Sequence, residues 1–365
     1  MIPIMEPFID EQEIDLVLDC LKSGWISSQG RYILEFEKAF SNYCGAEFGI
    51  ATSNGTTALH LALATLGVGP GDEVIVPALS FIATANAVVY AGARPVFADV
   101  NEKSWTLDPA AVKDLITHRT RAIIPVHLYG HPADMDPILR LAEENGLWVI
   151  EDAAEAHGAR YKGKRVGSLG HMACFSFYGN KIITTGEGGM IVTSHGEWTE
   201  KALMLRGHGM SKDRKYWHPV LGYNYRMTNI QAAIGLGQVN KLDYLIAQKR
   251  RVAQAYRQGL EGVRGVILPP EESWAKNVFW LYSIRIAPET GKKRDDLIEH
   301  LERHQVESRP LFYPIPEMPF YQGGGRFPIT KKISEQGISL PSAASITSEQ
   351  IGTVVELIKQ FLYKD

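Results

Sequence analysis

One lysine in the sequence has neighbours that make it a candidate for chemistry. Lys181 stands between the apolar run CFSFY (174–178) and a run rich in threonine and glycine that ends in GEGGM (186–190). An amine in a partly desolvated site has a lowered pKa and can attack a carbonyl to form a Schiff base. A solvated lysine at a strand end is the alternative reading. The glycines either let the backbone lie close to a ligand or form a turn into the next strand.

Asp152 is the second candidate, because it ends the apolar stretch VIED (149–152). A carboxylate at the end of a buried strand is costly unless a cation or a hydrogen-bond donor partners it. A protonated pyridine nitrogen is one such cation, and that pairing keeps a pyridoxal ring acting as an electron sink. A structural salt bridge or a metal ligand would explain Asp152 equally well.

The third candidate is the start of a predicted helix in TSNGTTALHLAL (52–63). The first N–H groups of a helix lack internal partners and, with the helix dipole, form an anion site. Gly55 and Thr56 would then hold a phosphate, or the segment is a plain helix cap. Together the three signals describe one cofactor: a phosphate cradle, a carboxylate for a pyridinium and a lysine for an aldehyde.

The elements around these residues alternate between short β-branched runs and helical stretches, which indicates a mostly parallel sheet with crossover helices. Ligands of such sheets bind at the carboxyl ends of the strands. After a long amphipathic segment the composition changes to short strands, helices and a loop rich in proline and aromatic residues. We therefore expect an α/β protein with a large domain over residues 1–245 and a smaller α+β domain over residues 246–365. The strands are predicted at 74–77, 95–100, 122–127, 148–154, 174–178, 189–194 and 279–286, and the helices at 56–67, 135–146, 228–260, 294–305 and 347–362.

The bulk composition of the 365 residues excludes several classes of protein. A formal charge of −3, with both signs mixed along the chain, gives no footprint for nucleic acid or an anionic membrane. Three widely spaced cysteines argue against a disulfide framework or a zinc cluster and fit the reducing cytoplasm. No signal peptide and no convincing membrane span are found. We expect a cytoplasmic protein without a metal site.

Five motifs in order resemble the DegT/DnrJ/EryC1/StrS family, the pyridoxal-phosphate (PLP)-dependent sugar aminotransferases. The resemblance covers nearly the whole chain and implies PLP-dependent fold type I, the aspartate aminotransferase fold. The motifs are NGTTALHLAL, PALSFIATANAV, IEDAAEAHGA, FSFYGNKIITTGEGGM and LGYNYRMTNIQAAIGLGQ.

The resemblance implies a role for each motif. Lys181 would bond to PLP and later carry the proton, and Asp152 would pair with the pyridine nitrogen. Phe81 would stack on the ring. The phosphate would be held by Gly55, Thr56 and Ser176, and by Asn224 of the neighbouring subunit, which implies a homodimer with shared active sites.

Glu155 stands where many family members have glutamine, near the phenolic oxygen of the cofactor. A glutamate could donate the same hydrogen bond only if protonated, and the neighbouring phenolate would favour that form. The motif forms around it are similar to those of members that transfer an amino group from L-glutamate to C4 of GDP-4-keto-6-deoxymannose. A UDP- or dTDP-linked 3- or 4-keto sugar remains an alternative. A deoxysugar dehydratase is a further one, but there a histidine replaces the lysine.

Contacts to the nucleotide sugar are implied for Trp25, Arg309 and Tyr313, since guanidinium and aromatic groups suit pyrophosphate and base. Packing at an interface would explain each of them equally well. Two further pairs are left open between a structural and a functional role, namely His127 with His131 and Arg206 with Arg226.

Overall fold

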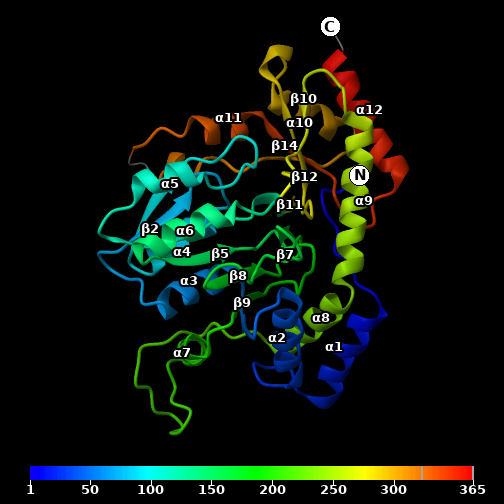
Figure 1. The fold of residues 1–365 in the computed structure, drawn as a ribbon. Coiled ribbons are helices and arrows are strands. Elements are labelled where there is room, and N and C mark those ends of the chain that lie inside the picture. Colours follow the sequence, from blue (N-terminus) through cyan, green and yellow to red (C-terminus); the bar gives the residue numbers. More distant parts are fainter. Residues whose placement is uncertain (322–323, 364–365) are drawn as a thin grey trace.

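A seven-stranded mixed sheet forms the centre of the computed structural model, which describes residues 1–321 and 324–363 (Figure 1). The strand order is β1-β9-β8-β5-β4-β2-β3. The five strands from β8 to β3 pair in parallel, whereas β1 and β9 are antiparallel to their neighbours. The strands are β1 (Phe48–Thr52), β2 (Glu73–Pro77), β3 (Arg94–Ala98), β4 (Thr120–Ile123), β5 (Trp148–Asp152), β8 (Met172–Ser176) and β9 (Gly189–Thr193).

Helices cover both faces of this sheet, which explains why its strands are apolar throughout rather than alternating. On one face α3, α4 and α7 pack on the strands. On the other, α5 and α6 cover one half, and α2 and α8 cover the half near β9. The helices of this part are α1 (Glu11–Ser23), α2 (Arg31–Cys44), α3 (Gly55–Thr65), α4 (Ala83–Tyr90), α5 (Pro109–Leu115), α6 (Met135–Asn145), α7 (Gly196–Arg206) and α8 (Asn229–Asn240).

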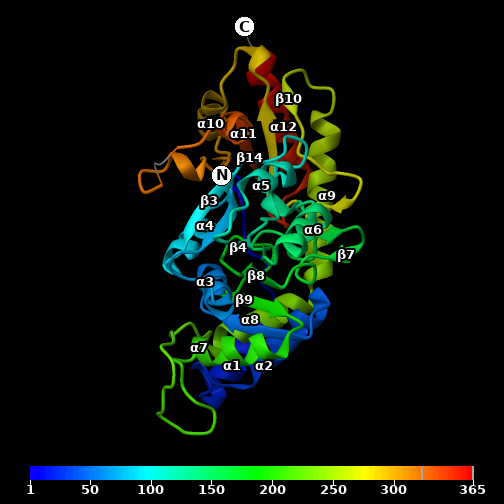
Figure 2. The same ribbon diagram turned by 60° about the vertical axis from the view of Figure 1, so that its left-hand side comes forward.

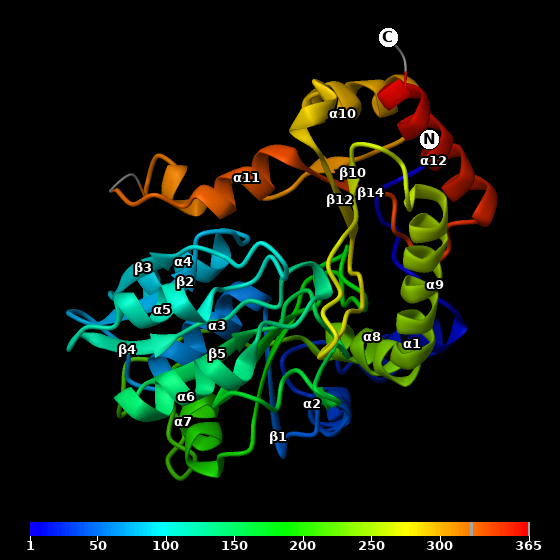
Figure 3. The ribbon, with the colours of Figure 1, turned by 45° about the horizontal axis from the view of Figure 1, so that its top comes forward.

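The C-terminal part is a separate layer built on an antiparallel sheet of order β10-β12-β14-β13. Helix α9 runs from α8 into this layer (Figure 3). A third, small sheet of order β11-β6-β7 joins the two parts, because β11 follows α9 in the chain while β6 and β7 follow β5. The remaining elements are α9 (Leu242–Leu260), α10 (Arg294–Arg303), α11 (Pro328–Gln336), α12 (Ser348–Tyr363), β6 (Arg160–Tyr161), β7 (Lys164–Arg165), β10 (Val266–Ile267), β11 (Ala275–Lys276), β12 (Tyr282–Ile286), β13 (Arg309–Pro310) and β14 (Gly337–Leu340), with short 3₁₀ turns at Leu128–Gly130, Pro288–Thr290 and Ile315–Glu317.

The N-terminal segment is bonded to the C-terminal layer at its start and packs against the core of the large part further along. Ile2 forms a parallel bridge with Val306, and the carbonyl of Ile4 accepts a hydrogen bond of 2.8 Å from the N–H of Ser342. Ile4 is buried. The two parts of the molecule are therefore connected by this segment as well as by α9.

The predicted alternation of strands and helices is confirmed, although the prediction named neither α1, α2, α4, α5 and α7 nor the short strands outside the large sheet. The antiparallel edge strand β1 was not among the predicted strands. The predicted amphipathic segment 228–260 divides at Lys241, which is not helical, into α8 and α9. Helix α8 begins with a capping box between Thr228 and Gln231 that fixes its first turn.

The loop after α7, residues 207–222, extends away from the body of the molecule (Figures 1 and 2). It carries exposed apolar side chains, among them Tyr216, Trp217 and Leu221, the last of which is 91% exposed.

Among the described residues, no helix is long and apolar enough to span a bilayer.

Candidate active site

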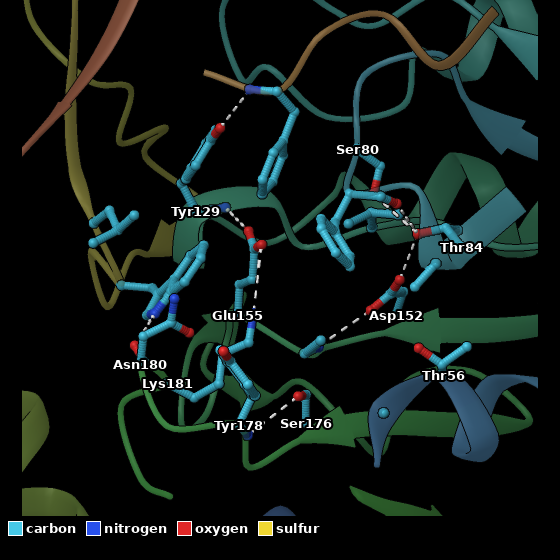
Figure 4. Close-up of a pocket in the computed structure, with 18 of the residues that line it drawn as sticks. Thr56, Ser80, Thr84, Tyr129, Asp152, Glu155, Ser176, Tyr178, Asn180 and Lys181 are labelled. Atoms are coloured by element: carbon cyan, nitrogen blue, oxygen red, sulfur yellow. Dashed lines mark hydrogen bonds and ion pairs between the residues drawn. The ribbon is translucent and has the colours of Figure 1, made fainter. Parts of the chain in front are cut away.

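A cavity of about 540 Å³ lies at the carboxyl ends of the parallel strands, between the large sheet and the C-terminal layer (Figure 4). Eight of the predicted site residues line it: Gly55, Thr56, Phe81, Asp152, Glu155, Ser176, Lys181 and Arg309. The C-terminal layer adds Trp280, Leu281, Pro310, Phe312 and Ser339. The cavity is thus where sheets of this type are expected to bind ligands.

Lys181 follows β8 and points into the cavity (Figure 4). Its side chain is only 11% exposed, and its Nζ lies 3.7 Å from Oε1 of Glu155 and 4.0 Å from the centre of the Trp280 ring. Burial lowers the pKa of the amine, although the charges of Glu155 and Asp152 oppose this effect. A lowered pKa makes a neutral, nucleophilic amine more accessible near pH 7.

Asp152 is the last residue of β5, and hydrogen bonds fix both of its carboxylate oxygens. The hydroxyl of Thr84 donates to Oδ2 over 2.7 Å, and the N–H of Ala154 donates to Oδ1 over 3.2 Å. Burial nevertheless raises the pKa of Asp152. A cationic group placed against this carboxylate would therefore be strongly favoured.

Glu155 is buried between the lysine and the backbone of a neighbouring loop. Its Oε2 accepts a hydrogen bond of 2.8 Å from the N–H of Tyr129, and its Oε1 faces Lys181. Burial raises the pKa of Glu155 to about 7, against the opposing influence of the lysine charge. The carboxyl group can therefore be neutral or charged near physiological pH.

The opposite end of the cavity is formed by the first turn of α3. Asn54 caps this helix, because its side chain accepts a hydrogen bond of 2.9 Å from the N–H of Thr57. A Cβ atom on Gly55 would lie 2.8 Å from the Cβ of Ser176, so only glycine allows this helix end and β8 to approach so closely. The first-turn N–H groups and the hydroxyls of Thr56 and Ser176 suit an anion such as phosphate.

Aromatic rings from both parts of the molecule form one wall of the cavity. Tyr129 lies between Phe312 and Trp280, with ring centres at 5.3 Å and 6.1 Å and nearly parallel planes. Phe312 also contacts Phe81 at 5.7 Å. The prediction from sequence missed Tyr129, Trp280, Phe312, Asn180 and Thr84. Only Thr84 and Asn180 stand in quoted family motifs, beside Phe81 and Lys181, and so had a signal.

Three predicted contact residues are not among those lining the cavity. Trp25 and Tyr313 are 56% and 55% exposed, and Asn224 is exposed on the loop that leads to α8. Arg309 does line the cavity and forms an ion pair of 2.9 Å with Glu307. The geometry of one chain leaves the roles of these four residues as predictions.

The residues left open between two roles have structural partners. His127 accepts a hydrogen bond of 3.0 Å at Nδ1 from the N–H of Ala133, and its Nε2 lies 3.0 Å from Glu151. His131 accepts at Nε2 from the N–H of Glu272.

The two arginines also have partners within the chain. Arg206 forms an ion pair of 2.7 Å with Glu37 and donates to the carbonyl of Ala51. Arg226 lies 3.2 Å from the Nε2 of His208.

The fold and the cavity define a PLP-dependent enzyme. A buried lysine, a buried carboxylate in need of a cation and an anion cradle at a helix N-terminus fit the aldehyde, the pyridinium and the phosphate of that cofactor. The chain belongs to the DegT/DnrJ/EryC1/StrS aminotransferase family, whose model matches residues 7–359. It is a PLP-dependent sugar aminotransferase with the predicted α/β fold.

Similar proteins match along the full length of the chain. GDP-perosamine synthase of Caulobacter vibrioides is 49% identical over 99% of this chain and 98% of that protein. GDP-perosamine synthase of Escherichia coli O157:H7 is 44% identical over 100% of this chain and 99% of that protein. The solved PLP form of Spr1654 from Streptococcus pneumoniae is 28% identical and superimposes with a TM-score of 0.93 over 98% of both chains.

Proposed function

We propose that this enzyme transfers the amino group of L-glutamate to C4 of GDP-4-keto-6-deoxymannose and so forms GDP-perosamine. The observation that carries the choice of substrate is the identity of 49% and 44% to two GDP-perosamine synthases over nearly the whole chain. The presence of Lys181 in the cavity supports aminotransfer over dehydration, because it gives the site an amine that can carry a proton.

The substrate is tested by kinetics with keto sugars linked to GDP, UDP and dTDP. We expect the highest kcat/KM with the GDP-linked 4-keto sugar, and one 2-oxoglutarate formed for each amino sugar. A higher kcat/KM with a UDP- or dTDP-linked sugar would replace the proposed substrate. Turnover of the sugar without consumption of glutamate would indicate a dehydratase instead.

The roles proposed for Lys181 and Asp152 follow from their positions. When bound, PLP supplies an aldehyde that accepts an amino group and a ring that withdraws electrons. Asp152, held by Thr84 and Ala154, is positioned to pair with the protonated ring nitrogen. The Nζ of Lys181 would bond to the aldehyde and, once released, act as the base and acid that moves a proton.

The proposed phosphate site consists of Gly55, Thr56 and Ser176, and Phe81 is proposed to stack on the ring. All four residues line the cavity, and Phe81 is 56% exposed, so its ring has space beside it. At the sugar end we propose that Arg309, Trp25 and Tyr313 contact the nucleotide sugar. The half-exposed guanidinium and rings support this role.

We further propose a homodimer in which Asn224 completes the phosphate site of the partner subunit. The exposed apolar side chains of Leu34, Tyr216, Trp217 and Leu221, which lie outside the cavity, support an interface. Mixed dimers test the shared site: a dimer of one Lys181→Ala and one Asn224→Ala subunit would hold one complete site and should show about half the activity of the parent dimer, well above either variant alone. No recovery in verified mixed dimers would place Asn224 in its own subunit's site.

The division into domains at 245/246 is retained as a proposal, with the N-terminal segment added to the smaller part. The hydrogen bonds of Ile2 and Ile4 with residues of the C-terminal layer support that addition.

We also propose that the enzyme works in the cytoplasm, where sugar nucleotides and reduced thiols are found. The three cysteines, Cys20, Cys44 and Cys174, are buried and free, which fits a reducing compartment.

A further inference from the structure

The indole ring of Trp280 faces the amine that the proposed function requires. Its ring centre lies 4.0 Å from Nζ of Lys181, well within the distance at which a cation is attracted to an aromatic face. The ring is itself fixed, since its Nε1–H donates a hydrogen bond of 2.7 Å to the carbonyl of Asn180, the residue before the lysine. The indole therefore contacts the end of the lysine side chain and anchors the start of its backbone.

The backbone around Trp280 is held in an uncommon conformation. Phe279, directly before it, has a φ of +49°, and Tyr129, on which the indole stacks, has a φ of +51°. Non-glycine residues rarely adopt this left-handed region, and such strain concentrates at functional sites. The N–H of Trp280 also donates a hydrogen bond of 3.0 Å to the carbonyl of Tyr129. The surrounding contacts thus hold the indole in one place at a cost in backbone strain.

The amine of Lys181 has charged neighbours on one side and this ring on another. Glu155 and Asp152 are the carboxyl groups that favour its charged form, whereas burial favours the neutral form. His157, nearby, is buried and its pKa is lowered to about 3, so it stays neutral. The face of an aromatic ring adds an attraction for the ammonium that does not depend on the protonation of any other group.

We propose that Trp280 is a positioning residue that holds the released ammonium group of Lys181 against its indole face, beside Glu155, whenever the amine is not bonded to the cofactor. This inference rests on the proposed role of Lys181. It gives the lysine a fixed resting place between its two tasks, bonding the aldehyde and carrying the proton. Without the ring, the charged amine would depend on Glu155 and Asp152, and the charge of Glu155, the carboxyl group beside it, changes near pH 7.

The test uses the apoenzyme and measures the rate of PLP capture between pH 6 and 10 from the absorbance of the bound form. Only the neutral amine attacks the aldehyde, so the midpoint of the pH profile reports the pKa of Lys181. Producing the protein in cells grown on 5-fluorotryptophan places a fluorine on the indole ring. The fluorine weakens the attraction of the ring for cations and changes the size of the side chain little. In the fluorinated enzyme we expect the midpoint to fall by roughly half a pH unit. An unchanged or higher midpoint would refute the proposal.

Trp280→Phe provides the matched control, because the chain has seven tryptophans that are all fluorinated together. Fluorination should leave the midpoint of Trp280→Phe unchanged. If that variant shifts as much as the parent, another tryptophan is responsible and the proposal is wrong. Trp280→Tyr serves in its place if the phenylalanine variant does not fold.

Borohydride reduction followed by peptide mapping separates this proposal from the proposed function. If the cofactor is not attached at Lys181, the role of the lysine itself is wrong, and the inference about Trp280 falls with it. If it is attached there and fluorination has no effect, only the inference about Trp280 fails.

Discussion

Glu151 and Glu155 are buried carboxyl groups four residues apart, and their surroundings differ sharply. Glu151 is fully buried and accepts four hydrogen bonds of 2.8–3.0 Å. One comes from His127, and three come from N–H groups of one loop, those of Gly167, Leu169 and Gly170. Glu155 accepts one backbone hydrogen bond and lies 3.7 Å from an amine, and burial raises its pKa to about 7. The first group organises a loop, while the second faces a cavity.

This difference shows how one short segment can serve stability and chemistry. A buried carboxylate that accepts four hydrogen bonds is held in one place and holds the donor groups around it. A buried carboxyl with few partners and an amine nearby can change its protonation at little cost. Asp152, between the two in sequence, is held by Thr84 and Ala154, yet burial raises its pKa, so a nearby cation would stabilise its charged form.

The largest expected effect comes from removing the amine of Lys181, which lies beside Glu155 in the cavity. Lys181→Ala should lower aminotransfer by at least about a thousandfold, because proton transfer and cofactor attachment both depend on it. Circular dichroism and gel filtration should show an unchanged fold. Turnover within tenfold of the parent enzyme would sink the assignment.

Glu151→Gln should reduce stability rather than chemistry. The amide group of glutamine presents N–H donors to a pocket of N–H donors, so we expect the free energy of unfolding to fall by about 3 kcal/mol. Urea unfolding of the apoenzyme measures this, with kcat compared on the folded fraction. A variant as stable as the parent would show that the loop does not depend on this carboxylate.

Glu155→Gln should change how stability depends on pH. Because the folded pKa is raised to about 7, the contribution of Glu155 to stability is full below about pH 4.5 and is lost as the pH rises toward 7. The variant lacks this loss. Its stability relative to the parent apoenzyme should increase by roughly 2 kcal/mol between pH 5 and pH 8. Parallel stability curves for the two proteins would contradict the raised pKa.

Thr84→Val gives the smallest expected effect and tests the support of Asp152. Valine keeps the shape of threonine but removes the hydroxyl that donates over 2.7 Å to Oδ2. We expect kcat/KM to fall roughly tenfold, or about 1.4 kcal/mol. Thr56→Val, which leaves Asp152 untouched, is the matched control, and its effect should appear in the affinity for PLP instead. If Thr84→Val matches the parent in kcat/KM, the hydroxyl does not support the carboxylate.

The sequence allowed prediction of the cavity residues whose type and local context are unusual. Lys181 and Asp152 stand out because a charged residue at the end of an apolar strand needs a physical reason. Gly55 stands out because a residue without a side chain begins a helix. Local patterns also predicted the strands of the large sheet other than β1, since the central ones are buried on both faces. The edge strand β1 was missed because its antiparallel pairing with β9 joins residues some 140 positions apart.

Residues that act through tertiary contact could not be found in this way. Trp280 follows Lys181 by 99 positions, and an aromatic residue at the start of a strand is typical of a core. Tyr129 reaches the cavity only because its backbone adopts a left-handed conformation that sequence does not indicate. Asn224 is proposed to act with a second subunit, so a single chain does not reveal its partner.

The pairing of Ile2 with Val306 also has a consequence during synthesis on the ribosome. The N-terminal segment emerges roughly 300 residues before its partners, which at about 5–20 residues per second means a wait of roughly 15–60 s. During that time the apolar side chains of Ile2 and Ile4 have no native surface to cover them. The large sheet can assemble early in translation. The pairing of Ile2 with Val306 can form only after the residues up to Val306 have been made.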